Sequence, residues 1–185
     1  MIKADKVKQS RLAHGDIIKD VEYIEYITEE KGNIEVSKII FPLVIILTQD
    51  CDLAQDYTFR LPESKKKTQD KHLLSTLVAP IYNLEHVYLG QHLSELDLLM
   101  AEISRKGTSG ERLLQNETAR YHYLEFPKEI PIAPSVIDFK HYFSVNVLYL
   151  RKIKEENFIC RVTELYREDI AQRFSSFLSR IALPD

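Results

Sequence analysis

The residues whose types could do chemistry together are Thr48-Gln49-Asp50-Cys51-Asp52, which directly follow the apolar run 43–47. Five apolar residues, three of them β-branched, indicate a strand that is buried on both faces. The polar cluster then lies at the carboxyl end of a core strand. Because charged groups are costly to desolvate, two carboxylates and a thiol at such a place indicate a site. Asp50 and Asp52 are therefore the candidate catalytic or metal-binding residues.

The chemistry of this cluster has three interpretations. A nucleophilic Cys51 would need a nearby cation or a helix amino end, whereas its sequence neighbours Asp50 and Asp52 disfavour a thiolate. Two carboxylates suit a hard divalent cation such as magnesium better than zinc, and no His-x-x-His or Cys-x-x-Cys spacing supports zinc. Alternatively, each Asp caps a turn through its own backbone and binds nothing. A divalent cation is thus a candidate cofactor whose identity stays open.

A second group of candidates combines aromatic rings with cations. His122 lies between Tyr121 and Tyr123, next to Arg120, and Lys140-His141 precedes Tyr142-Phe143. Such rings and cations can stack on bases and hold phosphates, although half-buried strands also carry this pattern. The candidate binding residues are Thr48, Gln49, Cys51, Tyr82, Arg120, His122, Lys140 and His141.

Length and composition predict one globular domain over residues 1–185. Hydrophobic residues make up 44% and charged residues 29%, with only five glycines and seven prolines, which argues against a disordered chain. The net charge of −3 carries no overall signature of a nucleic-acid binder. Two cysteines do not make a disulfide framework, so we expect a reducing cytoplasm. No apolar run approaches the roughly 18 residues of a membrane span, so no membrane partner is expected.

The elements that would position these residues are mostly strands. Alternating or continuous apolar patterns predict strands at 16–27, 34–40, 43–47, 73–82, 121–126, 136–145, 147–153 and 158–162. Turn residues predict connections at 29–33 and 154–157, and the polar segment 57–71, with lysines at 65–67, predicts a solvated loop or a phosphate-contacting patch.

Two helices complete the expected fold. Leu96, Leu99, Met100 and Ile103 have helical spacing, which predicts a helix over 94–105 inside a helical insertion at about 92–118. A second apolar face, carried by Ile170, Phe174 and Phe177, predicts a closing helix over 166–181 that packs on the sheet. The predicted fold class is therefore α+β: a bent antiparallel β-barrel of five or more strands, with a helical insertion and a C-terminal helix.

The order of several short motifs resembles the MazF/PemK family of bacterial toxins, which are small SH3-like barrels with a terminal helix. The matching segments are Gly15-Asp16-Ile17, residues 42–48, Val78-Ala79-Pro80-Ile81, the strand that carries Asp138, and residues 163–181. The resemblance implies an SH3-like barrel and a toxin–antitoxin, mobile-element or defence setting in a bacterium.

The chain departs from that family at the catalytic positions. Phe41 stands where the family has its catalytic arginine, and Tyr82 stands where it has its catalytic hydroxyl residue. A phenyl ring cannot stabilise the charge that develops on a phosphoryl oxygen, so MazF-type ribonuclease activity is not expected. The segment Phe139-Lys140-His141 also replaces the family's Gln-Ile-Arg.

Three functions follow from these patterns. The first is a catalytically diverged barrel that binds a macromolecule; the sequence does not distinguish a protein partner from a nucleic acid, and a homo-oligomer is compatible with it. The second is a metal- or acid/base-dependent hydrolase or nuclease centred on Asp50 and Asp52. The third is a protein-interaction scaffold that docks through the helix at 94–105. Convergence of Asp16, Asp50, Asp52 and a histidine would favour the enzyme.

Overall fold

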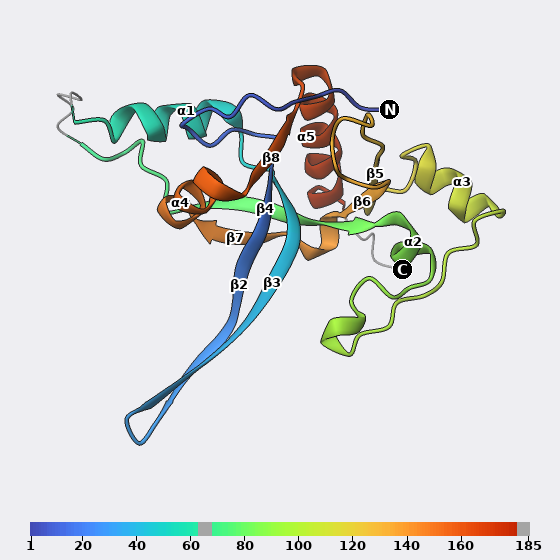
Figure 1. The fold of residues 1–185 in the computed structure, drawn as a ribbon, viewed down its shortest axis with the longest axis horizontal. Coiled ribbons are helices and arrows are strands. Elements are labelled where there is room, and N and C mark those ends of the chain that lie inside the picture. Colours follow the sequence, from blue (N-terminus) through green and yellow to red (C-terminus); the bar gives the residue numbers. More distant parts are fainter. Residues whose placement is uncertain (63–67, 181–185) are drawn as a thin grey trace.

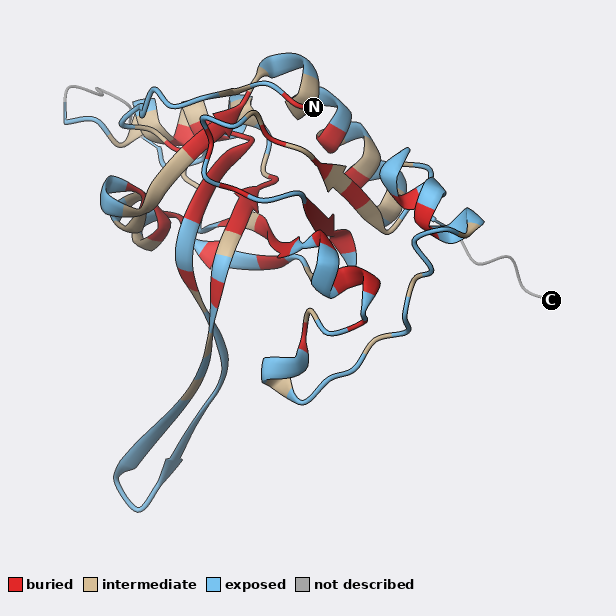
Figure 2. Cartoon of the chain, turned by 45° about the vertical axis from the view of Figure 1, so that its right-hand side comes forward, coloured by how far each residue is buried: buried red, intermediate tan, exposed pale blue. Residues whose placement is uncertain are grey.

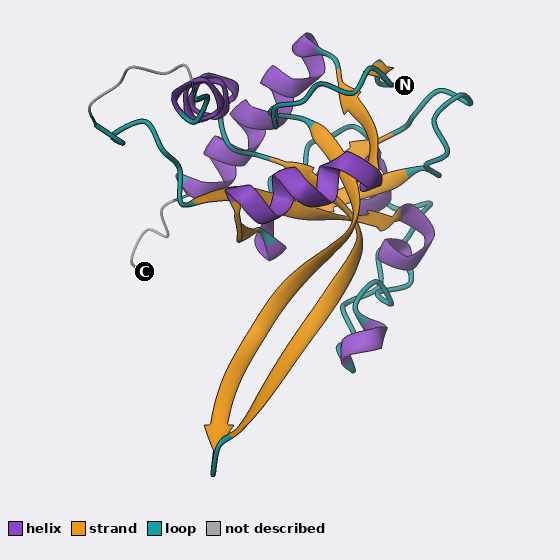
Figure 3. Cartoon of the chain, turned by 60° about the vertical axis from the view of Figure 1, so that its left-hand side comes forward, coloured by secondary structure: helices purple, strands orange, loops and turns teal. Residues whose placement is uncertain are grey.

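The computed structural model describes residues 1–62 and 68–180, which form an α+β fold around one curled antiparallel sheet (Figures 1 and 3). Every pairing among the described strands is antiparallel, and the sheet curls into a half-barrel. The predicted bent antiparallel sheet of five or more strands is confirmed. In spatial order the strands are β1 (Ala4–Asp5), β8 (Phe158–Val162), β2 (Asp16–Glu30), β3 (Asn33–Ile46), β4 (Ser75–Asn83), β6 (Ser135–Asp138) and β5 (Tyr121–Leu124), with β7 (Phe143–Asn146) also paired to β4.

Helices lie around this sheet in the described part of the chain. They are α1 (Asp50–Phe59), α2 (Leu84–Tyr88), α3 (Thr108–Leu114), α4 (Val147–Asn157) and α5 (Glu164–Leu178), with 3-10 turns η1 (Ser94–Leu96) and η2 (Phe139–His141). Within residues 1–62 and 68–180, none of the helices combines the length and apolar character that crossing a membrane requires.

The β2–β3 hairpin is the longest element, and its outer half projects away from the body (Figure 1). Lys31 and Gly32 have φ angles of 52° and 82°, which give the two-residue turn that suits a twisted hairpin. The predicted strands 34–40 and 43–47 are one strand, β3. Pro42 does not interrupt it, because the β2–β3 register skips Pro42 and the pairing with β4 begins only at Val44, so Pro42 needs no ladder bond.

The core consists of two groups of buried side chains on the two sides of the sheet's curl. Val44, Ile45, Ile46 and Leu47 are all buried, as the sequence predicts for this segment. Under α5, Ile170 and Phe174 are buried and Phe177 is partly buried against the second group. The predicted packing of the C-terminal helix on the sheet is therefore confirmed.

The helix predicted at 94–105 is wrong. Only the turn η1 forms, and Asp97 then reverses the chain with a φ of 57°. The following loop bonds to α2 and the turn after it: the amide of Met100 donates to Gly90 O at 2.8 Å, and that of Ile103 to Tyr88 O at 2.9 Å. The apolar side chains at helical spacing are explained by an irregular loop whose Leu96, Met100 and Ile103 pack on the core.

The strand predicted at 147–153 and the turn at 154–157 are also wrong, because both belong to α4. The Asn146 side chain caps this helix by accepting hydrogen bonds from the amides of Leu148 and Tyr149. Val147, Leu150 and Lys154 form its buried face, and the long Lys154 side chain reaches a carboxylate inside the protein. Because a charged residue, Lys154, occupies the buried side of α4, the apolar face of this helix is not recognisable in the sequence.

Two further boundaries differ from the predictions. The strand predicted at 136–145 is divided into β6, η2 and β7, because the carboxylate of Asp138 accepts the amide of Lys140 and turns the chain. Residues 50–59 form α1, not a turn followed by a loop. The predicted phosphate-contacting lysines at 65–67 lie outside the described residues.

Candidate functional site

The Asp50 motif lies at the start of α1, so its carboxylates project from a helix rather than from an extended strand. Arg11 donates from both terminal nitrogens to the two oxygens of Asp50, each at 2.9 Å, and the His14 amide donates at 3.2 Å. Burial alone would raise the pKa of Asp50, but the hydrogen bonds and charge of Arg11, the charge of Arg167 and the His14 amide together outweigh it and hold that pKa below its ordinary value. Asp50 thereby fastens the N-terminal segment to α1.

The acids whose convergence would have favoured an enzyme have separate partners. Asp16 is fully buried and accepts hydrogen bonds from Lys154 Nζ at 2.7 Å and Arg161 Nε at 2.6 Å. Asp52 is exposed, and its recorded contact is the Cys51 thiol at 3.8 Å. Asp16, Asp50 and Asp52 each interact with different neighbouring residues, and these three acids form no common centre with a histidine.

The other residues of this motif form hydrogen bonds with the backbone or are exposed to solvent. The Thr48 hydroxyl accepts the Leu77 amide at 2.6 Å and so holds β4 against the end of β3. The imidazole of His14 lies between the carbonyl oxygens of Thr48 and Arg167, at 3.2 and 3.0 Å. Gln49 and Cys51 are exposed.

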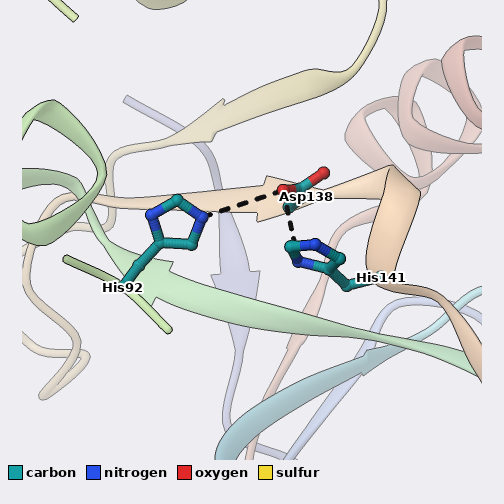
Figure 4. A group of neighbouring side chains, drawn as sticks. All are labelled: His92, Asp138 and His141. Atoms are coloured by element: carbon teal, nitrogen blue, oxygen red, sulfur yellow. Dashed lines mark ion pairs between the residues drawn. The ribbon is translucent and has the colours of Figure 1, made fainter. Parts of the chain in front are cut away.

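Three of the predicted binding residues do come together, at a different place. They meet around the carboxylate of Asp138: Tyr82 from β4, Arg120 from just before β5 and His141 from the end of η2. His92 approaches the same carboxylate from the loop after α2. Figure 4 shows the rings of His92 and His141 turned toward the Asp138 carboxylate. Lys140 is exposed beside this group, and His122 lies apart, buried against Phe139.

Asp138 is the centre of this cluster and is fully buried. Arg120 Nε donates to Oδ1 at 2.8 Å and to Oδ2 at 3.0 Å, and Arg120 Nη2 donates to Oδ2 at 2.5 Å. Oδ2 also lies 3.2 Å from His141 Nδ1 and 3.9 Å from His92 Nε2. The Tyr82 hydroxyl is 3.2 Å from the same nitrogen of His141.

Burial sets the protonation of these groups. Burial lowers the pKa of His92 and of His141, and the carboxylate of Asp138 opposes this shift only in part. Burial also raises the pKa of Tyr82. At neutral pH the two imidazoles are therefore neutral, with free lone pairs, and the phenol keeps its proton. His122 differs from them: burial lowers its pKa to about 3, as expected for an imidazole of the core.

His92 lacks the contacts that a buried imidazole normally has. Its side chain is 1% exposed, yet neither ring nitrogen makes a hydrogen bond of normal geometry, and the backbone of His86 interacts with the ring only closely enough to oppose the lowering of its pKa. Its ring stacks on that of Tyr82, with the ring centres 4.8 Å apart. An unsatisfied buried polar group costs roughly 1–3 kcal/mol. Such a group usually has a partner outside the protein chain, such as a water molecule or an ion.

The cluster adjoins a cleft at the base of the β2–β3 hairpin. Two hollows of about 380 and 250 Å³ share Ile39, Phe41, Tyr82, Leu93 and Leu96 as walls. His92 lines the larger hollow and His141 the smaller. Apolar walls with a few convergent polar groups are typical of a small-molecule site.

Neither models of known protein families nor curated proteins match this chain. The sequence patterns missed His92, which stands in no motif, and gave Asp138 only as part of a family resemblance. No local signal could have joined them, because they meet through the pairing of β4 with β6.

Proposed function

We propose that this protein is a hydrolase whose reactive centre is formed by Tyr82, His92, Asp138 and His141. The observation that supports this proposal is the meeting of two neutral imidazoles and a buried carboxylate beside a cleft. Groups whose ionisation is shifted by burial and by a specific charged partner, next to a cavity, are typical of catalytic sites. This places the proposed chemistry at Asp138 instead of at Asp50 and Asp52.

Each group of this centre has a chemical role. His92 and His141 position a water molecule next to the scissile bond. Asp138, held by Arg120, keeps negative charge beside them and orients the His141 ring through Nδ1. The Tyr82 hydroxyl supplies a proton to the leaving group. Each water molecule consumed adds its hydroxyl to the substrate and its hydrogen, overall, to the leaving group.

The cleft indicates a substrate with an apolar or aromatic part. Tyr23, Phe41 and Phe143 form a contiguous set of rings at its wall, with ring centres 5.1–6.4 Å apart. Such rings stack on planar groups, including nucleobases. An aryl ester, an aryl phosphoester and a short single-stranded RNA are accordingly the substrates to test.

The proposal is tested with these substrates on matched variants. We expect Asp138→Asn and His141→Gln to lower kcat/KM by about 10²–10⁴-fold, which is the usual contribution of a positioned acid or base. Asp50→Asn and His72→Gln are the controls, because Asp50 bonds to Arg11 and His72 lines neither hollow. Retained activity in the folded Asp138 and His141 variants, or no hydrolysis of any test substrate, would contradict the proposal.

The fold that accompanies this proposal is a diverged MazF/PemK-like, SH3-like barrel. The order of the motifs and the curled antiparallel sheet support it. Phe41 packs against Tyr23 and Phe143, so an aromatic cluster stands where that family has its arginine. RNA cleavage by the family mechanism is therefore not expected. A cytoplasmic location and a toxin–antitoxin, mobile-element or defence setting remain predictions.

A second candidate function, binding of a protein through the β2–β3 hairpin, is favoured by one specific feature. Ile34, Val36 and Ile40 lie on the same face of β3, and Ile27 lies directly opposite Val36. All four are at least half exposed, and Figure 2 shows that the outer hairpin is exposed along its length. Because an isolated two-stranded ribbon is marginally stable in water, an apolar face on it indicates a binding surface.

Shortening the hairpin tests this second function. Joining Ile24 to Lys38, which face each other in the register, through Asn-Gly removes the outer ribbon and keeps a suitable turn. We expect an almost unchanged melting temperature, because the removed residues contribute no core. Sedimentation of both chains over a range of concentrations then measures whether a second copy binds to the ribbon. A large loss of stability would instead assign the hairpin a structural role.

A further inference from the structure

We propose that His92, Asp138 and His141 bind one divalent first-row transition-metal ion, through one nitrogen of each imidazole and Oδ2 of the carboxylate. The ion would be the cofactor of the proposed hydrolytic centre. Only its catalytic use rests on the proposed function. Binding itself can be measured without any substrate.

The unpartnered imidazole of His92 is the first observation. Its ring is buried and directed at Asp138, but Nε2 remains 3.9 Å from Oδ2, which is too far for a hydrogen bond (Figure 4). An ion between these two atoms would give that nitrogen a partner. A neutral imidazole with an available lone pair is the commonest protein ligand of such ions.

The distances between donor atoms are the second observation. One donor atom from each of His92, Asp138 and His141 lies within 4.8 Å of the other two. Two donors that each lie roughly 2.1 Å from a tetrahedral zinc ion are about 3.4 Å apart. Side-chain rotations that move the imidazoles by about 1 Å would therefore close the set around one ion.

The hydrogen bonds of Asp138 leave room for an ion. Oδ1 accepts hydrogen bonds from Arg120 Nε at 2.8 Å and from the Lys140 amide, whereas Oδ2 accepts from Arg120 Nη2 at 2.5 Å and faces both imidazoles. Arg120 Nε also lies 3.0 Å from Oδ2, but it is closer to Oδ1, so the second lone pair of Oδ2 is the one that an ion would take. Arg120 then holds the ligating carboxylate from behind, as outer hydrogen-bond partners commonly do in metal sites.

The donor set selects the kind of ion. Two imidazole nitrogens and one carboxylate oxygen suit zinc, iron, cobalt or nickel, whereas magnesium and calcium prefer oxygen ligands. Asp50, in the cluster where the sequence suggested a hard cation, already accepts two hydrogen bonds from Arg11. The Asp138 centre is therefore the better metal site.

Three protein ligands leave a coordination position for water, as in catalytic zinc sites. An ion held by His92, His141 and Asp138 would supply a water molecule of lowered pKa as the nucleophile. Tyr82 would give its proton to the leaving group and recover one from solvent, so that overall the hydroxyl of the water goes to the substrate and a hydrogen goes to the leaving group. The Tyr82 hydroxyl lies beside these ligands, 3.2 Å from His141 Nδ1.

Titration of the metal-free full chain with Zn²⁺, followed by calorimetry, tests the site, and Co²⁺ absorption reports the geometry around the ion. We expect one ion per chain in the wild type. His92→Gln and His141→Gln should weaken binding by more than about 100-fold, since even outer-shell changes cost about 10–100-fold. Circular dichroism verifies that each variant is folded.

The control is His86→Gln, which should bind Zn²⁺ as the wild type does because His86 is exposed and outside the cluster. Zinc affinity that is unchanged in a folded His92→Gln variant would overturn the inference, as would the absence of stoichiometric binding in the wild type. Metal binding without hydrolysis would retain the site and reject the proposed hydrolase. Hydrolysis by metal-free protein would retain the hydrolase and reject the metal.

Discussion

Replacing Asp16 with Asn is expected to lower the free energy of unfolding by about 3–5 kcal/mol, because the change leaves buried cations without their counter-charge. Asp16 is fully buried, and the Lys154 side chain that contacts it is 2% exposed. Arg161 donates to its other oxygen, and the Ala13 amide donates as well. This one carboxylate thus joins the N-terminal segment, α4 and β8.

Denaturant unfolding of the wild type and the variant measures the loss. Asp52→Asn serves as the matched control, because Asp52 is exposed and such surface changes usually stay within about 0.5 kcal/mol. Adding Lys154→Met to the Asp16 variant should recover part of the loss, since it removes the unpaired ammonium. Equal stability of Asp16→Asn and Asp52→Asn would show that the buried ion pairs contribute little.

The sheet could be predicted from the sequence because its strands have local signals. Residues 44–47 form a continuous apolar run, and the residues around Gly32 have the chemistry of a tight turn. Both features depend on a few neighbouring residues, so the structure forms them as the local sequence predicts, independently of contacts with distant parts of the chain.

The elements that were predicted wrongly depend on distant contacts. Lys154 looks like a turn residue in the sequence, yet it lies on the buried face of α4 because Asp16 neutralises it. Leu96 and Met100 have helical spacing, yet the loop that carries them is held by backbone bonds to α2 and the turn after it. In both places tertiary contacts override the local pattern.

The candidate site follows the same division. Arg120 and His141 could be selected from residue type and aromatic context, and Tyr82 from a family resemblance. The structure brings the three together. That they meet at Asp138 with His92 depends on sheet pairing and on an irregular loop, neither of which the sequence encodes locally. Their binding role stays a prediction until the variants are measured.

Replacing Phe174 with Ala is expected to cost about 3–5 kcal/mol of unfolding free energy, because it removes a buried ring from the core. Phe174 is 6% exposed, and its side chain packs from α5 onto the segment that carries the candidate site. Its ring centre is 5.5 Å from that of Phe139 and 5.3 Å from that of Tyr142, and these two residues flank Lys140 and His141. The ring therefore supports the backbone that positions His141.

This support gives the variant a second readout. Where Phe174→Ala remains folded, we expect weaker Zn²⁺ binding and slower hydrolysis than in the wild type, because η2 loses the ring that packs against Phe139 and Tyr142. Phe174→Leu fills much of the space and should lose less of all three quantities. Phe177→Ala is the comparison on the same helix, because Phe177 is only partly buried and its ring is 6.1 Å from Phe139. A Phe174→Ala protein with reduced stability but unchanged metal binding would separate the packing of α5 from the geometry of the site.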